Sequence, residues 1–210
     1  MQLSRPISSV SPGLHGGVLA VLARTDKPLT GRTVAALVRP AASLSGVQKV
    51  LDDLARQGIV RAEPAGRAKL YTLNREHLAY PAIHALVHLW EELITRIAAE
   101  ASTWEVPAVA VWLFGSAARG EGGPNSDVDL LVIRSESVDD TEPTWLRQVE
   151  TLSEQVTAWS GNDCQVLELS SAELEDFMKR DERLVAELRR DAIPLVGARP
   201  RRLLSTTADR

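Results

Sequence analysis

The sequence predicts an α+β fold in two domains, and three observations support this. Residues 1–80 carry 11 basic and 5 acidic side chains, whereas the remaining residues carry 13 basic and 23 acidic ones. In the basic half, apolar residues recur at helical spacing and then fall into two short runs typical of a hairpin. In the acidic half, two apolar stretches typical of buried strands flank a polar, glycine-containing loop. With 210 residues, 44% of them hydrophobic, each domain can bury a core.

Three helices are predicted in the basic half. The first begins near Leu14, and the second follows Thr30, whose hydroxyl is a good N-cap. Pro40 breaks the chain. The third helix then begins after an N-cap at Ser43 or Ser45, and a glycine at position 58 is well placed to end it.

A hairpin follows these helices, with strands at residues 59–61 and 69–73 and a Pro/Gly-containing turn between them. Three short helices followed by a hairpin resemble the winged helix-turn-helix of bacterial transcription regulators. The resemblance implies an N-terminal winged helix-turn-helix domain over residues 1–78 that binds DNA. It also implies a homodimer, since such domains usually read two half-sites.

The resemblance places the third helix in the major groove, where Gln can read adenine edges while basic side chains contact phosphates. The predicted DNA-binding residues, from this helix and the hairpin, are Ser45, Gln48, Lys49, Arg61, Arg67 and Lys69. Asp52 and Asp53 on the same helix would repel the DNA backbone if they faced it. Two alternatives stay open: a winged helix used for dimerisation or protein docking, and a chance drift of surface charge.

A linking helix is predicted over residues 79–103, because an apolar stripe runs from Ile83 to Ile97. This helix can couple the two domains or pair with its twin in a dimer. Its opposite face carries His84 and His88, one turn apart. The pair is either a divalent-metal site or part of a solvated polar face.

The acidic half contains a run with recognisable chemistry. An apolar strand leads into Gly115-Ser116, a short turn carries Arg119, and Ser126-Asp127-Val-Asp129 opens a second apolar strand. A glycine lets the backbone approach a phosphate closely, and a serine with its neighbouring amides donates hydrogen bonds to anions. Asp127 and Asp129 are two residues apart on a strand, so both carboxylates face the same way, as a magnesium site requires.

This spacing resembles the DNA polymerase β-like nucleotidyltransferase superfamily, most closely its small "minimal" members. The resemblance implies a nucleotidyltransferase domain over residues 104–198, with a small mixed β-sheet flanked by helices. It implies Mg²⁺ held by Asp127 and Asp129, and a nucleoside triphosphate such as ATP bound by Gly115, Ser116, Arg119 and Ser126. Arg119 either neutralises phosphate charge or pairs with Glu121 or an aspartate to hold the loop. The alternative interpretation is an Asp-rich turn with a serine cap.

The family carries a third carboxylate on a neighbouring strand, which helps to activate the attacking hydroxyl. The corresponding strand here begins near Cys164, and its apolar residues align Gln165 with the expected Asp. A glutamine cannot act as a base. Asp163 shares the parity of Gln165 and is the expected partial substitute, whereas Glu168 has the opposite parity and points away.

The leading functional hypothesis is transfer of AMP from MgATP to a hydroxyl of a protein, nucleic acid or small molecule, in a cytoplasmic protein without a visible signal or membrane segment. The fused DNA-binding domain would suit transcription regulation of a toxin–antitoxin operon, by analogy with some minimal nucleotidyltransferases. A second hypothesis is a transcription regulator whose degenerate domain senses nucleotide without turnover. A third is an antibiotic-modifying enzyme, because aminoglycoside nucleotidyltransferases share the signature. Residues 199–210 are expected to form a flexible tail.

Overall fold

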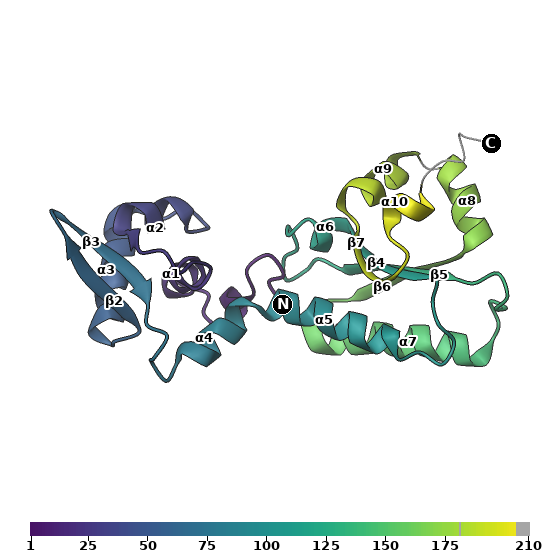
Figure 1. Cartoon of the computed structure of the whole chain (residues 1–210), viewed down its shortest axis with the longest axis horizontal. Coiled ribbons are helices and arrows are strands. Elements are labelled where there is room, and N and C mark those ends of the chain that lie inside the picture. Colours follow the sequence, from purple (N-terminus) through teal and green to yellow (C-terminus); the bar gives the residue numbers. More distant parts are fainter. Residues whose placement is uncertain (181, 205–210) are drawn as a thin grey trace. The chain divides into compact units, whose positions relative to one another are not determined.

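The protein was studied as a computed structural model, which describes residues 1–180 and 182–204. The chain divides into two compact units, one comprising Gln2 and Ser4–Trp90 and the other comprising Met1, Leu3 and the residues from Glu91 onward. Each unit combines helices with a small sheet (Figure 1), so the predicted α+β class is confirmed.

Short helices and a three-stranded sheet make up the first unit. Its elements are η1 (Pro6–Ser9), α1 (Leu14–Ala23), β1 (Leu29–Thr30), α2 (Gly31–Leu37), α3 (Leu44–Arg56), β2 (Val60–Ala65), β3 (Ala68–Leu73) and α4 (Tyr80–Val87). Side-chain caps start α2 and α3: the Thr30 hydroxyl accepts from the Thr33 amide, and the Ser43 hydroxyl accepts from the Gly46 amide, both at 3.1 Å. Both caps were predicted, and of the two serines it is Ser43 that accepts.

The hairpin β2–β3 is antiparallel, with Val60 opposite Leu73 and Ala65 opposite Ala68, and β1 pairs with the other edge of β3. Gly66, at the turn, has a φ of +61°. The helices and the sheet enclose one apolar core, which includes Val34, Leu51 and Tyr71. This core fixes the positions of α2, α3 and the hairpin relative to one another.

The predicted linking helix is two helices, α4 and α5 (Leu89–Ser102). The break lies at His88, whose backbone N–H approaches the carbonyls of both His84 and Ala85 and whose ring Nδ1 lies 2.8 Å from the same His84 carbonyl. The two imidazole rings stack with their centroids 4.1 Å apart. Within the described chain, no third metal-ligating side chain joins this pair.

The second unit is built around a four-stranded sheet. Besides α5, its elements are β4 (Ala110–Phe114), α6 (Gly115–Ala118), β5 (Val128–Arg134), α7 (Pro143–Ser160), β6 (Cys164–Ser170), α8 (Ser171–Arg180), α9 (Glu182–Asp191), β7 (Ile193–Gly197) and α10 (Pro200–Leu203). The strand order is β6-β5-β4-β7, with β5 and β6 parallel and the other neighbours antiparallel. The sheet is therefore small and mixed, as predicted.

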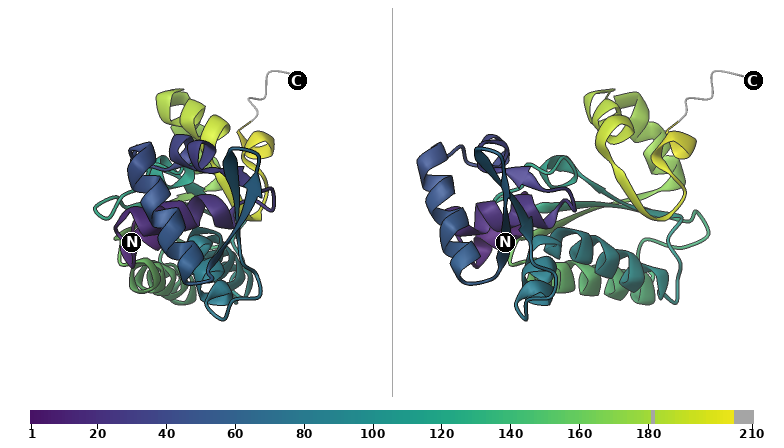
Figure 2. Two further views of the ribbon diagram at one scale, coloured as in Figure 1. Left: turned by 90° about the vertical axis from the view of Figure 1, so that its left-hand side faces the viewer. Right: turned by 60° about the vertical axis from the view of Figure 1, so that its left-hand side comes forward.

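Helices cover both faces of this sheet. Figures 1 and 2 show α5 and α7 on one face and α8, α9 and α10 on the other. The central strand β5 is consequently apolar on both faces, and its residues from Leu130 to Ile133 are fully buried. Alternate residues Leu131 and Ile133 pack in the same core as Leu188 of α9.

The chain after β7 differs from the expected tail. Residues 200–203 form α10, and Leu204 is completely buried in the core beside Trp112. Leu203 and Leu204 pack in this core, so the segment contributes to the cover of the sheet. Residues 205–210 of the predicted tail lie outside the described residues. Among the described helices, none combines the length and apolar character needed to cross a bilayer.

Candidate active site

The close approach of Gly115 to Asp129 organises the candidate site. Strand β4 ends at Phe114, which lies opposite Asp129 on β5. The next residue, Gly115, turns the chain with a φ of +70°. A methyl group added there would overlap Asp129 Oδ2 and lie 3.0 Å from Cγ. Only a glycine suits this position, because it tolerates the positive φ and leaves room for the carboxylate.

Asp127 and Asp129 lie at the start of β5, as their spacing predicts. Asp127 is exposed just before the strand, and Asp129 is partly buried within it. Burial raises the pKa of Asp129, and the negative charge of Asp127 raises it further, while Arg119 acts in the opposite direction. A divalent cation would relieve both unfavourable effects. The two carboxylates therefore fit a hard cation by their chemistry.

The described part of the chain offers few other ligands for such a cation. No group of three or more His, Cys, Asp and Glu side chains with metal-site geometry occurs among residues 1–180 and 182–204. Mg²⁺ is usually bound by one or two carboxylates together with substrate phosphates and waters. The arrangement thus fits a metal ion that arrives with a phosphate-containing substrate.

A buried asparagine holds the loop that leads to these carboxylates. Asn162, only 2% exposed, donates through Nδ2 to the carbonyls of Gly123 at 3.0 Å and Ser126 at 2.8 Å, and a longer contact reaches Pro124. Ser126 Oγ accepts from the Gly123 amide within the same loop. The predicted nucleotide ligand Ser126 is thus engaged in holding the loop. Sequence reasoning missed Asn162, since a lone asparagine in a turn carries no distinctive signal.

Strand β6 places Gln165 directly beside Asp129 in the parallel register. The residue that the apolar residues of β6 aligned with the expected third carboxylate therefore lies next to Asp129, and this residue is a glutamine. Asp163 lies one position before β6; its carbonyl accepts from the Val128 amide at 2.8 Å, and the residue is exposed. Glu168 points elsewhere, accepting from Arg134 Nε at 2.7 Å.

Arg119 is held by two carboxylates. Its Nε donates to Glu121 at 2.9 Å, and its Nη1 lies 3.8 Å from Asp191 Oδ2. The hydrogen bond that Arg119 donates to Glu121 raises the pKa of Arg119. In the structure Arg119 therefore forms the ion pairs of the pairing alternative. Arg119 is partly exposed, and phosphate binding remains open to it.

Asp191 is a further site residue that the sequence did not single out. It ends α9, two residues before Ile193, which pairs with Leu113 on β4. This places Asp191 at the same sheet edge as Gly115. Its two oxygens accept from Arg190 at 2.8 and 2.7 Å, and this interaction lowers the pKa of Asp191. An aspartate just before the last strand was the only signal available.

The predicted DNA-binding residues fall into three places in the first unit. Gln48, Arg67 and Lys69 line one cavity. Ser45 and Lys49 are exposed on α3 without lining it. Arg61 lines a different cavity, where it forms an ion pair with Glu76. Arg32, which sequence reasoning missed, lines the first cavity.

Replacing Asp129 by asparagine is expected to stabilise the ligand-free protein. Because the pKa of Asp129 is raised, the folded protein binds the carboxyl proton more tightly than the unfolded chain does. The free energy of unfolding therefore falls as the pH rises from the ordinary pKa of 3.8 through the raised pKa of the folded state. At pH 7 the variant should melt roughly 1–3 °C higher without divalent cations, a small shift because the carboxylate is half exposed. The difference should shrink below pH 4. Calorimetry measures the melting temperatures, with Glu150→Gln, an exposed position on α7, as the control. A melting temperature of Asp129→Asn at or below that of the wild type at pH 7 would contradict the prediction.

Comparison with curated proteins gives no match. Three solved structures illustrate the structural comparison. A structure described as a toxin-antitoxin with AMP-PNP has 16% identity and a TM-score of 0.35, covering 54% of this chain and 80% of that one. Human N-acetylserotonin methyltransferase in complex with SAM has 24% identity and a TM-score of 0.28, with coverages of 47% and 34%. TrmBL2, described as an archaeal chromatin protein with a novel mode of DNA binding, has 15% identity and a TM-score of 0.31, with coverages of 86% and 74%.

These structural similarities are too low to carry an argument about function. The family comparison is more informative, because it falls on the unit that contains the paired carboxylates. It extends from within α5, through β4, the Gly115 turn, β5 and β6, to the first residue of β7. Residues 95–193 match the family model of the nucleotidyltransferase domain.

Proposed function

We propose that the second unit transfers a nucleotidyl group, AMP from ATP, to a hydroxyl acceptor. The observation that carries the proposal is the carboxylate of Asp129 packed against Gly115, with Asp127 beside it, at one edge of the sheet. The match of residues 95–193 to the nucleotidyltransferase domain supports the same assignment. The acceptor is a protein, a nucleic acid or a small molecule.

In this proposal each side chain has a role that its position supports. Asp127 and Asp129 hold Mg²⁺, which would neutralise charge that develops on the phosphates. Gly115 lets the backbone approach the β- and γ-phosphates, and the Ser116 hydroxyl donates to them. Arg119 exchanges its contact with Glu121 for a phosphate oxygen.

The transfer itself is an in-line displacement. The acceptor hydroxyl oxygen forms a bond to the α-phosphorus, the bond from that phosphorus to the β-bridging oxygen breaks, and pyrophosphate leaves. We assign the hydroxyl proton to Asp163, since Gln165 beside Asp129 cannot accept it. Asp163 is exposed, so the proton can pass from it to solvent.

Transfer of α-labelled nucleotide tests the proposal. Purified protein with Mg²⁺ and each α-labelled nucleoside triphosphate, with and without cell extract, should label an acceptor, most strongly with ATP. Asp127→Asn/Asp129→Asn should lose the signal by at least a hundredfold, because metal and phosphate lose both carboxylates. Glu150→Gln should retain it. Labelling that survives in the double variant would defeat the catalytic assignment.

A second function, DNA binding by the first unit, is favoured by the surroundings of α3. The two aspartates that counted against it have partners: Asp52 lies 3.4 Å from Lys69 Nζ, and Asp53 contacts Arg56 at 2.7 Å. We propose that the first unit is a winged helix-turn-helix that binds DNA as a homodimer. Gel shifts with the DNA upstream of its own gene, performed at low salt, test this; absence of any shift there would overturn it.

Gln165 favours a related alternative, in which the second unit senses nucleotide without turnover. This alternative expects DNA affinity to change when MgATP saturates the protein, with no labelled product. DNA affinity that is unchanged by MgATP would oppose it. In either case we place the protein in the cytoplasm and propose regulation of its own operon, as in toxin–antitoxin pairs.

A further inference from the structure

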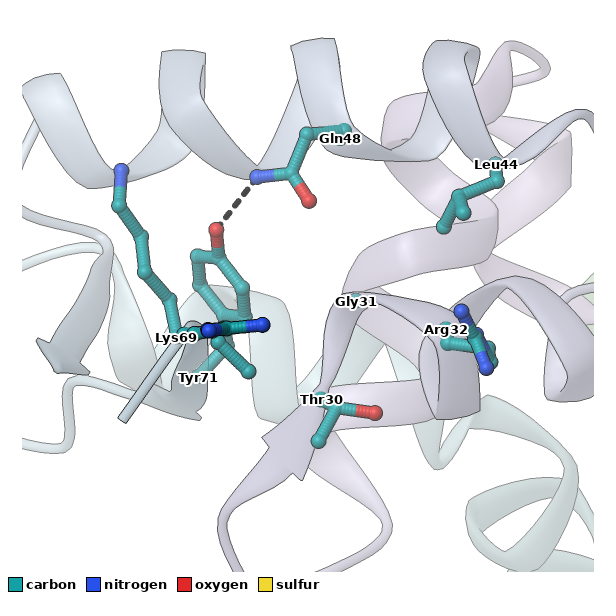
Figure 3. A pocket seen from close by; sticks show the side chains of 9 residues that line it. Thr30, Gly31, Arg32, Leu44, Gln48, Lys69 and Tyr71 are labelled. Atoms are coloured by element: carbon teal, nitrogen blue, oxygen red, sulfur yellow. Dashed lines mark hydrogen bonds between the residues drawn. The ribbon is translucent and has the colours of Figure 1, made fainter. Parts of the chain in front are cut away.

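A cavity of about 600 Å³ lies between α2, α3 and the hairpin of the first unit. The lining includes three cationic side chains, Arg32, Arg67 and Lys69, together with Gln48 and Tyr71. Figure 3 shows Arg32 and Leu44 toward one end of the cavity, and Gln48, Tyr71 and Lys69 toward the other. The cavity therefore extends along α3 with cationic side chains near both ends.

Gln48 forms part of the wall of this cavity. Its Nε2 donates to the buried Tyr71 hydroxyl at 2.5 Å, drawn as a dashed line in Figure 3, and to Asp52 at 3.3 Å. On its other side, a methyl group added to Gly31 would come within 2.7 Å of Gln48 Oε1. Both ends of the amide are thus confined. Reading adenine would require Gln48 Nε2 to give up one of its two hydrogen bonds, to Tyr71 or to Asp52.

The charge that lines the cavity is mostly uncompensated. Lys69 is balanced by Asp52, but in the described part of the chain neither Arg32 nor Arg67 has an ion-pair partner. Both arginines are exposed. Asp53, the neighbouring acid on α3, is engaged by His15 and Arg56 instead. Two guanidinium groups thus remain free to bind an anion.

We propose that this cavity binds backbone phosphates of double-stranded DNA through Arg32 and Arg67, and that Gln48 positions its wall instead of reading a base. The inference rests on the proposed DNA binding of the first unit. Guanidinium groups bind phosphate oxygens in a bidentate manner, and an open cavity of about 600 Å³ with cations from α2 and from the hairpin has room for more than one phosphate. Such contacts fix the position of α3 without selecting a sequence.

The salt dependence of DNA binding by the full chain tests this inference. Affinity for a labelled random duplex of about 25 base pairs is measured between 50 and 200 mM salt, where each phosphate contact contributes about −0.9 to the slope of log K against log salt. Arg32→Ala/Arg67→Ala should make the slope about 1.8 less negative. Arg56→Ala, on the same helix but paired with Asp53, should leave it unchanged. Gln48→Ala should weaken adenine-rich and adenine-poor duplexes by equal factors.

The outcomes separate the two proposals. If the wild type binds no duplex even at 50 mM salt, DNA binding itself fails and the inference fails with it. If the wild type binds but the double variant keeps its slope, only the cavity assignment is overturned. A mononucleotide or inorganic phosphate that binds the wild type but not the double variant, without competing with duplex, would identify a small-anion site and contradict the proposal. If Gln48→Ala lost affinity only for adenine-rich duplexes, Gln48 would contact adenine, and its assignment to the cavity wall would be wrong.

Discussion

Gly115→Ala is expected to abolish nucleotidyl transfer while leaving the protein folded. The added methyl group would overlap Asp129 Oδ2, so the carboxylate must swing away from its position beside Asp127. A displacement of about 1 Å of a catalytic group commonly costs a hundredfold in rate, and here it also separates the two magnesium ligands. We therefore expect at least a hundredfold loss in kcat/KM, measured with α-labelled ATP at saturating Mg²⁺.

The fold contains a matched control for this variant. Gly120 has nearly the same backbone conformation, with φ of +69°, but an added methyl group there meets nothing within 4 Å. Both substitutions place alanine in the left-handed region at a cost of roughly 1–2 kcal/mol. Gly120→Ala should thus lose similar stability but retain transfer. Equal activity losses in the two variants would show that backbone strain, and not the position of Asp129, matters.

The core of the candidate site could be predicted because its parts are close in sequence. The glycine after an apolar strand and the two aspartates at strand spacing can be read from the sequence, and the antiparallel pairing of β4 with β5 then brings Gly115 and Asp129 to one edge. The family resemblance, aligned on the apolar residues of β6, put Gln165 at the position of the third carboxylate, and the parallel register of β5 and β6 places this residue beside Asp129.

Residues that reach the site from distant segments could not be predicted in this way. Asn162 acts through the carbonyls of a loop almost forty residues away, and backbone carbonyls leave no trace in a sequence pattern. Asp191 depends on how α9 leads into the edge strand β7. The break at His88 and the burial of Leu204 likewise depend on hydrogen bonding and packing that periodicity does not report.

Asn162→Ala is expected to have the largest effect on stability of the variants considered. The substitution leaves the carbonyls of Gly123 and Ser126 without the Nδ2 donor at a position that is 2% exposed. An unsatisfied buried polar group costs about 1–3 kcal/mol, so the loss of both bonds should cost about 2–4 kcal/mol. In a domain of this size, that lowers the melting temperature by about 5–15 °C. Calorimetry of the full chain at pH 7 measures this.

The same variant should bind Mg²⁺ more weakly during transfer, because the loop that Asn162 holds leads directly to Asp127. We expect the Mg²⁺ concentration for half-maximal transfer to rise several-fold at temperatures where the variant is folded. Asn125→Ala, an exposed asparagine of the same loop, should change neither quantity. Asn162→Asp preserves the shape of the side chain but turns a carboxylate oxygen toward the carbonyls of Gly123 and Ser126. It should therefore also lower the melting temperature and raise the Mg²⁺ requirement. Asn162 Oδ1 also accepts from the amino terminus of Met1, a bond that the aspartate keeps, so a wild-type melting temperature and Mg²⁺ requirement in Asn162→Asp would show that the Nδ2 donor is dispensable. The Nδ2 hydrogen bonds would then not be what holds the carboxylates in place.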